Sequence, residues 1–204
     1  MKKTNKFIYL ISPIRIKNEN FYDNLIEIFK TKKIAYFQLR LKKEKPKKIF
    51  QIGKKIKKIC KKYKVKLIIN DSPILTKKIN ADGCHLGQRD LSIIKARKII
   101  KNKIIGITCH NSKKLVMKAI ANGSDYIALG AFYSTKTKKV KHKATIKLLK
   151  EVKKVTKIPI VAVGGIKFNN YKKLLLNKAK FLAISSYIWE NKKLNPAEAI
   201  KRLK

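Results

Sequence analysis

Residues 104–132 read IIGITCHNSKKLVMKAIANGSDYIALGAF. The first and last seven residues of this stretch are apolar runs rich in β-branched and aromatic side chains, a composition typical of buried strands. Between them, residues 112–123 place apolar side chains at helical spacing and lysines on the other face. Two buried strands joined by an amphipathic helix predict a parallel β-α-β unit.

The same alternation continues along the whole chain. Strands are expected at residues 7–12, 35–40, 66–71, 83–87, 104–110, 126–132, 158–165 and 181–186. Lysine-faced helices are expected at residues 21–31, 46–64, 73–80, 92–102, 112–123, 144–156, 169–178 and 195–204. Eight such units predict an α/β protein with one (β/α)8 TIM-barrel domain over residues 1–204. A doubly wound open sheet is the alternative, and the repeat count of eight favours barrel closure.

The charge of the chain is strongly positive. Lys and Arg number 53 against 11 Asp and Glu, which gives a formal net charge of +42. Such a balance usually indicates a nucleic-acid or membrane-surface partner. Here the lysines are spread over every expected helix, and the arginine and aromatic interleaving of a nucleic-acid groove is absent. We therefore expect solvated helix faces rather than a nucleic-acid partner, and an electrostatic attraction for phosphorylated small molecules.

The cysteines indicate a reducing compartment. Cys60, Cys84 and Cys109 are odd in number and lack close pair spacing, which argues against a disulfide framework. Cys84-His85 and Cys109-His110 lie on expected strands, where neighbouring side chains point to opposite faces, so at most one member of each pair could face a shared metal.

The first residues, MKKTNKFIYLIS, indicate a first strand rather than a signal peptide, because basic residues follow at once and no small-residue cleavage site appears. No segment approaches the roughly 18 apolar residues of a membrane span. We expect a cytoplasmic protein with no membrane partner, and the sequence leaves open whether it forms a homo-oligomer.

A barrel brings the carboxyl ends of its strands to one rim, where active sites form. Polar and glycine residues gather at these expected strand ends: Gln38, Arg40, Lys42, Asn70, Asp71, Gln88, Asp90, Thr108, His110, Ser134, Thr135, Thr137, Lys138, Gly164, Gly165, Ser185 and Ser186.

Two of these groups suit phosphate. Gly164-Gly165 after the seventh strand, with serines after the eighth, match the phosphate cradle of many barrels, although the glycines could also form a plain turn. Arg40 and Lys42 alternate along an extended segment and so share a face, where they could hold a diphosphate.

The scarce acidic residues suggest a cation. Asp71 and Asp90 follow adjacent strands, and two carboxylates with substrate phosphates and water would suit Mg²⁺. The alternative is helix capping, because each aspartate also precedes an expected helix.

Seven segments in this order and spacing resemble the thiamine-phosphate synthase family of barrel enzymes, over about residues 9–189. They are QLRLK, LIIND, ADGCHLGQRD, GITCH, GSDYIALGAFYSTKTK, IPIVAVGGI and FLAISS.

The resemblance implies a reaction that joins 4-amino-2-methyl-5-hydroxymethylpyrimidine diphosphate to a thiazole phosphate, or its carboxylated form, and releases diphosphate. It implies that the pyrimidine diphosphate is held by Gln38, Arg40, Lys42, Asn70, Thr108 and Lys138, with Leu39 and Leu41 in the same QLRLK segment. It implies that Asp71 and Asp90 bind Mg²⁺. The residues that it places against the thiazole phosphate are Thr135, Lys136, Thr137, Gly165, Ile184 and Ser185.

The resemblance also implies a dissociative substitution. The electron-rich aminopyrimidine would stabilise a cation while Mg²⁺, Arg40 and Lys42 stabilise the leaving diphosphate, and Thr108 and Lys138 complete the catalytic set. The chain departs from the family at Leu41, Thr108 and Ala131, where an acidic residue, a serine and a proline are common. Thr108 keeps the hydroxyl, and Leu41 should point away from the mouth.

Two other functions compete with the synthase. Thiazole tautomerases share the barrel and much of the phosphate site, and under that hypothesis His85 and His110 would be examined for proton transfer. The diphosphate and Mg²⁺ set favours the synthase. A basic barrel that binds nucleic acid would not explain why acidic residues lie beside the cationic strand ends.

Overall fold

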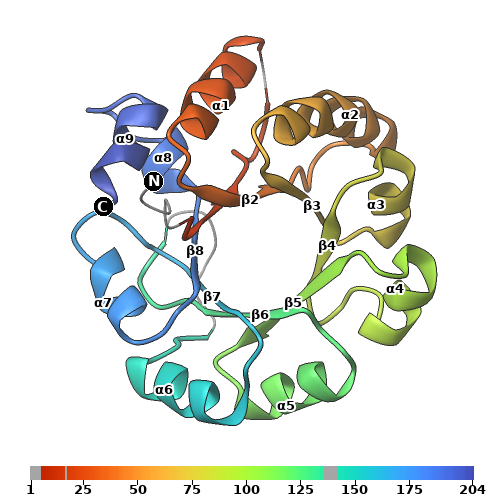
Figure 1. Cartoon of the computed structure of the whole chain (residues 1–204), viewed down its shortest axis with the longest axis vertical. Helices are drawn as coiled ribbons and strands as arrows, with labels where there is room; N and C mark the ends of the chain where they lie inside the picture. Colours follow the sequence, from red (N-terminus) through yellow and green to blue (C-terminus); the bar gives the residue numbers. More distant parts are fainter. Residues whose placement is uncertain (1–5, 17, 136–141) are drawn as a thin grey trace.

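The strands close into one barrel. The structure is a computed structural model that describes residues 6–16, 18–135 and 142–204. Its strands are β1 (Ile8–Ile11), β2 (Ile34–Leu39), β3 (Lys66–Asn70), β4 (Gly83–Leu86), β5 (Ile104–His110), β6 (Tyr126–Gly130), β7 (Ile160–Val163) and β8 (Phe181–Ile184). Each pairs in parallel with its sequence neighbour, and β8 pairs with β1 (Figure 1). This confirms the TIM barrel and excludes the open sheet.

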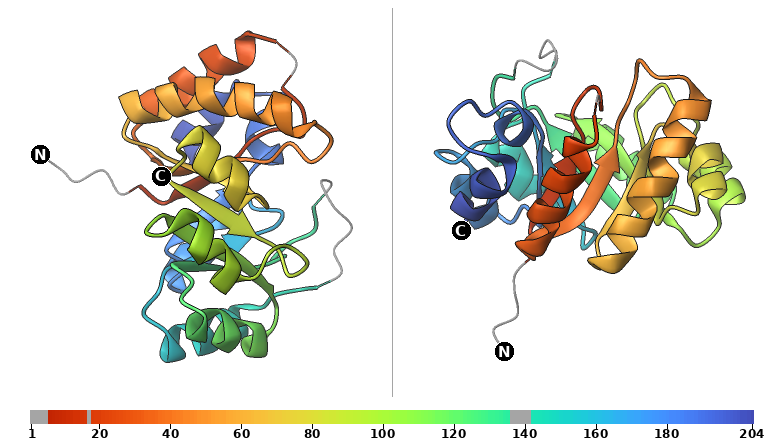
Figure 2. Two further views of the ribbon diagram at one scale, coloured as in Figure 1. Left: turned by 90° about the vertical axis from the view of Figure 1, so that its right-hand side faces the viewer. Right: turned by 90° about the horizontal axis from the view of Figure 1, so that it is seen from above.

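Helices cover the outside of the barrel (Figures 1 and 2). They are α1 (Asn20–Lys30), α2 (Pro46–Lys62), α3 (Pro73–Ile79), α4 (Ile93–Ile100), α5 (Lys113–Ala121), α6 (Ile146–Val155), α7 (Tyr171–Leu176), α8 (Ser186–Trp189) and α9 (Pro196–Arg202). In the described part of the chain, none has the length and apolar character that crossing a membrane requires.

Helix α8 was not expected from the sequence. It is a single turn that follows β8 directly, and so short a segment carries no helical periodicity. Its Trp189 donates a hydrogen bond from Nε1 to the carbonyl of Ile11, 2.7 Å away, which ties the end of β8 to the end of β1.

The apolar residues form two layers. On β3, Leu67 and Ile69 face the helices and belong to the outer hydrophobic cluster, whereas Ile68 between them faces the barrel interior. The interior cluster also contains Tyr9, Tyr126, Val161 and Phe181, which fill the space beneath the rim; Ala128 and Ala183 complete its buried set. The barrel is therefore packed below and open only at its carboxyl rim.

Two aspartates brace the opposite, amino-terminal end of the sheet. Asp82 lies just before β4, and its Oδ2 accepts hydrogen bonds from the amide of Leu67 (2.8 Å) and from Lys57 (2.7 Å). Asp125, just before β6, does the same for Ile105 and Arg97, both at 2.7 Å. Asp82 and Asp125 therefore stabilise the amino-terminal end of the sheet. This role does not account for the acidic residues at the carboxyl rim.

The packing at the bottom of the barrel interior, here called the floor, depends on a glycine on β5. Gly106 on β5 pairs in register with Tyr126 on β6. A Cβ at Gly106 would lie 1.9 Å from Cζ of Tyr126, so the ring occupies the space that any other residue would fill. The tyrosine ring can lie across the barrel only because residue 106 is glycine.

Gly106→Ala should therefore destabilise the protein by about 1–3 kcal/mol or more, because the added methyl group forces the Tyr126 ring out of its place. The free energy of unfolding in denaturant measures this. Gly123→Ala is the control, since nothing lies within 4 Å of its Cβ position and only backbone strain is added. Losses of equal size in the two variants would contradict this description of the floor.

Candidate active site

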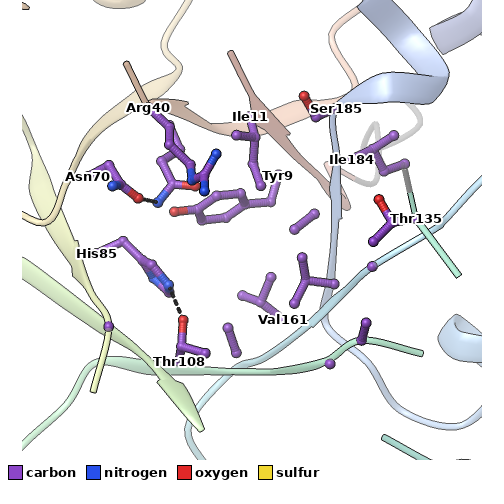
Figure 3. A pocket seen from close by; sticks show the side chains of 18 of the residues that line it. Tyr9, Ile11, Arg40, Asn70, His85, Thr108, Thr135, Val161, Ile184 and Ser185 are labelled. Carbon is purple, nitrogen blue, oxygen red and sulfur yellow. Dashed lines mark hydrogen bonds between the residues drawn. The ribbon is translucent and has the colours of Figure 1, made fainter. Parts of the chain in front are cut away.

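The rim of the barrel surrounds one large pocket of about 630 Å³. All eight strands or the loops that follow them contribute side chains to its lining (Figure 3). The predicted site residues that line it are Gln38, Arg40, Lys42, Asn70, Asp71, Asp90, Thr108, Thr135, Gly165, Ile184 and Ser185. Lys136, Thr137 and Lys138 lie outside the described residues.

Leu39 and Leu41 do not line the pocket. Their side chains are 1% and 3% exposed and pack in the hydrophobic layer between sheet and helices. The alternation of an extended chain explains this, since Gln38, Arg40 and Lys42 point to the opposite side. Only the backbone of the two leucines remains available to a ligand.

The end of β2 is held by hydrogen bonds on both sides. Gln38 donates from Nε2 to Oδ1 of Asn70 at 3.0 Å, which joins β2 to β3 (Figure 3). The amide of Arg40 donates to the hydroxyl of Ser12, also at 3.0 Å, which joins β2 to β1. Burial lowers the pKa of Arg40, opposed by the nearby charge of Asp71, and the guanidinium stays charged in any case. The pocket thus holds a partly desolvated cation on a strand end whose main chain is hydrogen-bonded to β1.

Asp71 and Asp90 lie close enough to share a hydrogen bond. Burial, followed by the contact with Asp90, raises the pKa of Asp71, although Lys42 opposes this with an ion pair of 3.3 Å. Oδ2 of Asp90 also accepts from the amide of Gly87 at 2.6 Å. Two neighbouring carboxylates that disfavour joint ionisation are suited to a proton or a cation between them.

Helix capping does not explain these aspartates. The cap of α3 is Ser72, whose hydroxyl accepts from the amide of Leu75, and the cap of α4 is Ser92, which accepts from Lys95. Asp71 instead has a φ of +63°, which turns it out of the strand.

The acidic pair fits Mg²⁺ better than a closed metal centre. Across the described ranges, no group of three His, Cys, Asp or Glu side chains could hold a metal ion. Mg²⁺ commonly takes one or two carboxylates and completes its shell with water and substrate phosphates. Cys84 and Cys109 pack in the outer hydrophobic layer, away from the pocket.

His85 lies at the bottom of the pocket in a chain of hydroxyl groups. Its Nε2 is 2.9 Å from Oγ1 of Thr108 (Figure 3). Its Nδ1 is 2.9 Å from the hydroxyl of Tyr126. Burial, with smaller contributions from Arg40 and Lys42, lowers the pKa of His85 to about 4. The ring is neutral near pH 7 and is poorly suited to act there as an acid.

Two further histidines, His110 and His142, belong to the pocket. The ring centroids of His110 and His142 are 4.5 Å apart, and both side chains line the pocket. His110 has a φ of +53°, which marks the end of β5.

Two glycines after β7 also line the pocket. Gly164 and Gly165 have φ values of +103° and +61°, a region that favours glycine. A Cβ at Gly165 would lie 2.2 Å from the carbonyl oxygen of Ser134. The hydroxyl of Ser185 donates to the carbonyl of Ser12 at 3.2 Å, which ties the end of β8 to the end of β1.

Sequence reasoning missed several pocket residues. Ser12 ends β1 and contacts both Arg40 and Ser185, yet no residue of the first strand was considered for the site. A hydroxyl residue at the end of the first strand is the feature of the sequence that could have identified Ser12 as a site residue. Tyr9 and Tyr126 resemble ordinary core residues in the sequence, and His142 carries no motif at all.

Comparisons with known proteins agree with this geometry. The family model described as thiamine monophosphate synthase matches residues 8–188. A thiamine-phosphate synthase from Pelagibacter ubique is 64% identical over 203 residues, covering 100% of this chain and 98% of that protein. One from Clostridium acetobutylicum is 34% identical over 196 residues, covering 95% and 92%.

A solved structure is similar in fold. The thiamine phosphate pyrophosphorylase from Pyrococcus furiosus superposes with a TM-score of 0.86 at 24% identity, covering 98% of this chain and 94% of that one. The family match spans most of the chain, and the relative at 64% identity spans all of it. This chain therefore belongs to the thiamine-phosphate synthase family.

Proposed function

We propose that the rim pocket catalyses the thiamine-phosphate synthase reaction as a dissociative, Mg²⁺-assisted substitution. The substrates would be 4-amino-2-methyl-5-hydroxymethylpyrimidine diphosphate and 4-methyl-5-(2-phosphoethyl)thiazole or its carboxylated form. The observation that carries the proposal is the placement of Arg40, Lys42, Asp71 and Asp90 together on one side of the pocket. Cations and a paired carboxylate site are what a diphosphate with Mg²⁺ requires.

The pyrimidine end would lie between β2, β3 and β5. Gln38 and Asn70 offer amide groups that already bond to each other, and the hydroxyl of Thr108 faces the same space. The backbone amide of Arg40 is held by the Ser12 hydroxyl, which fixes the main chain that carries the guanidinium. Preorganised groups of this kind bind a charged leaving group without reorganising during the reaction.

Asp71 and Asp90 would hold the Mg²⁺, which when bound supplies positive charge to the departing diphosphate oxygens. Lys42 pairs with Asp71 at 3.3 Å and would remain beside the diphosphate. The remaining coordination positions would come from substrate oxygens and water, because the described protein groups supply only this acidic pair.

The thiazole phosphate would lie on the other side of the rim, against Thr135, Gly165, Ile184 and Ser185. We propose that Lys136 and Thr137 also bind it and that Lys138 reaches the pyrimidine diphosphate; these three lie outside the described residues. The pocket of about 630 Å³ is within the range of sites that enclose small ligands.

Catalysis would then depend on position and charge. Arg40 and Lys42 stabilise the diphosphate as its bond to the pyrimidine methylene carbon breaks. The thiazole nitrogen attacks that carbon from the opposite side of the pocket, and no protein nucleophile is needed. Holding both rings in one enclosed site replaces a collision between solutes with a step inside one complex.

We further propose one domain over residues 1–204, a cytoplasmic location and small-molecule substrates without a nucleic-acid partner. The lysine-rich helices would then serve solubility and the attraction of phosphorylated substrates.

The test is thiamine-phosphate formation by the purified protein, given both substrates with and without Mg²⁺. Product should form only with Mg²⁺, and Asp71→Asn should lower the rate by a factor of about 100 or more, because it removes a charged metal ligand. Asp23→Asn, which removes an exposed carboxylate from α1, is the control and should keep the rate. A metal-independent rate, or equal rates in the two variants, would overturn the Mg²⁺ assignment.

Asp71→Asn should remain folded, since asparagine tolerates the positive φ at this position. The pKa of Asp71 is raised in the folded state, so its contribution to stability is present at low pH and is lost as pH rises through that pKa. Asparagine cannot ionise, so the variant without Mg²⁺ should be at least as stable as the wild type at pH 7. A loss of activity in Asp71→Asn would therefore not result from unfolding.

Gly165→Ala should raise the KM for the thiazole phosphate about tenfold or more and leave the KM for the pyrimidine diphosphate nearly unchanged. The added methyl group would meet the Ser134 carbonyl and the Tyr133 side chain, which displaces the loop against the phosphate. Gly123→Ala adds a methyl group at a similar positive φ but in open space, and it controls for backbone strain. If both KM values rose equally, the glycine pair would not be a specific phosphate site.

A further inference from the structure

We propose that His85 is a positioning residue that makes the Thr108 hydroxyl a hydrogen-bond donor toward the pocket. The inference rests on four hydrogen-bonded side chains, those of Tyr9, Tyr126, His85 and Thr108. The hydroxyls of Tyr9 and Tyr126 are 2.8 Å apart, and the hydroxyl of Tyr126 is 2.9 Å from Nδ1 of His85. Nε2 of His85 is 2.9 Å from Oγ1 of Thr108 on β5. All four side chains line the pocket, but Thr108 is half-buried, whereas the two tyrosines are buried.

A neutral imidazole has one donor and one acceptor nitrogen, so the two ends of the His85 ring must play opposite roles. If Nδ1 carried the proton, it would donate to Tyr126 and Thr108 would donate to Nε2. The two tyrosine hydroxyls would then have two protons to donate, but only the one hydrogen bond between them could use a proton. One proton would be left without a partner among the described residues, at side chains that are each 2% exposed.

If Nε2 carries the proton, every interior donor is used. Tyr9 donates to Tyr126, Tyr126 donates to Nδ1 of His85, and Nε2 donates to Thr108. Because an unsatisfied buried donor is costly, the tyrosine pair selects this second arrangement. The proton of Thr108 then remains free for a ligand.

The environment of Thr108 supports a fixed orientation. Its backbone carbonyl accepts a hydrogen bond from Nε2 of Gln88, so residues of β4 and its following loop hold both the main chain and the side chain of Thr108. The ring of His85 is in turn stacked on Tyr126, with centroids 5.6 Å apart and planes 16° apart. Rotation of the His85 ring about its Cβ–Cγ bond would break its hydrogen bonds to Tyr126 and Thr108.

This arrangement has a consequence for specificity, which rests on the proposed function. A donor at Thr108 recognises an acceptor atom, and an aromatic ring nitrogen of the aminopyrimidine is such an atom. A ring that presents C–H or N–H at this position would face the Thr108 proton without a partner. Buried polar groups of this kind discriminate strongly between otherwise similar ligands.

The direct test is ¹⁵N NMR of the histidine rings in the free wild-type protein, without substrates. The chain has three histidines, and His85→Gln identifies the relevant signals by their loss. We expect His85 to be neutral with the proton on Nε2, and Thr108→Val to shift the Nε2 signal far more than the Nδ1 signal. A proton on Nδ1, a doubly protonated ring, or an Nε2 signal unaffected by Thr108→Val would each overturn the proposal.

A kinetic cycle tests the consequence. His85→Asn retains an amide near Tyr126 but is too short to reach Thr108, whereas His85→Gln extends toward it. We expect His85→Asn and Thr108→Val each to lower kcat about tenfold, the size of one hydrogen bond, and the double variant to lose no more than either. His85→Gln should lose less than His85→Asn, and the double variant, rather than this order, separates positioning from packing.

Losses that multiply to about a hundredfold in the double variant would overturn the positioning role. The NMR result does not depend on turnover. A wild-type protein that makes no product but shows the Nε2 proton would therefore refute the proposed function and leave the His85 assignment standing.

Discussion

The pocket depends on the contact between the Tyr126 ring and the bare backbone of Gly106. That contact closes the barrel interior from below and fixes how deep a ligand can reach. It also places the Tyr126 hydroxyl where it meets both Tyr9 and His85. A single position without a side chain thus supports the packing of the core and the polar chemistry at the bottom of the site.

Charge is divided between the two ends of the sheet. Asp82 and Asp125 bind strand amides and basic side chains at the amino-terminal end, where they contribute to folding. Asp71 and Asp90 lie at the carboxyl rim. There, burial and the neighbouring Asp90 carboxylate disfavour the ionised form of Asp71 and raise its pKa. Titratable groups whose pKa is shifted by burial and by a neighbouring charge are typical of functional sites.

The fold and much of the rim were predictable because parallel strands need long apolar runs and covering helices, and both patterns repeat eight times in the sequence. The strand-end rule then gave Arg40, Asn70 and Thr108 without any structural knowledge. The sequence could not decide whether Asp71 caps the following helix, because that depends on which side chain accepts the helix amide. Ser72 does so.

Other features depend on contacts between distant residues. The hydrogen-bonded chain from Tyr9 to Thr108 joins four strands, and only Thr108 was expected to bind a substrate; the sequence does not show that the four side chains meet. Helix α8 was missed because one turn has no period. Ser12 was missed because only its position between Arg40 and Ser185 gives it a task.

The most direct measurement is a crystal structure of the protein with thiamine phosphate, diphosphate and Mg²⁺. The account predicts diphosphate beside Arg40 and Lys42, the metal between Asp71 and Asp90, and the phosphate of the product against Gly165 and Ser185. Product bound in the reverse orientation, or a metal that contacts neither aspartate, would contradict it.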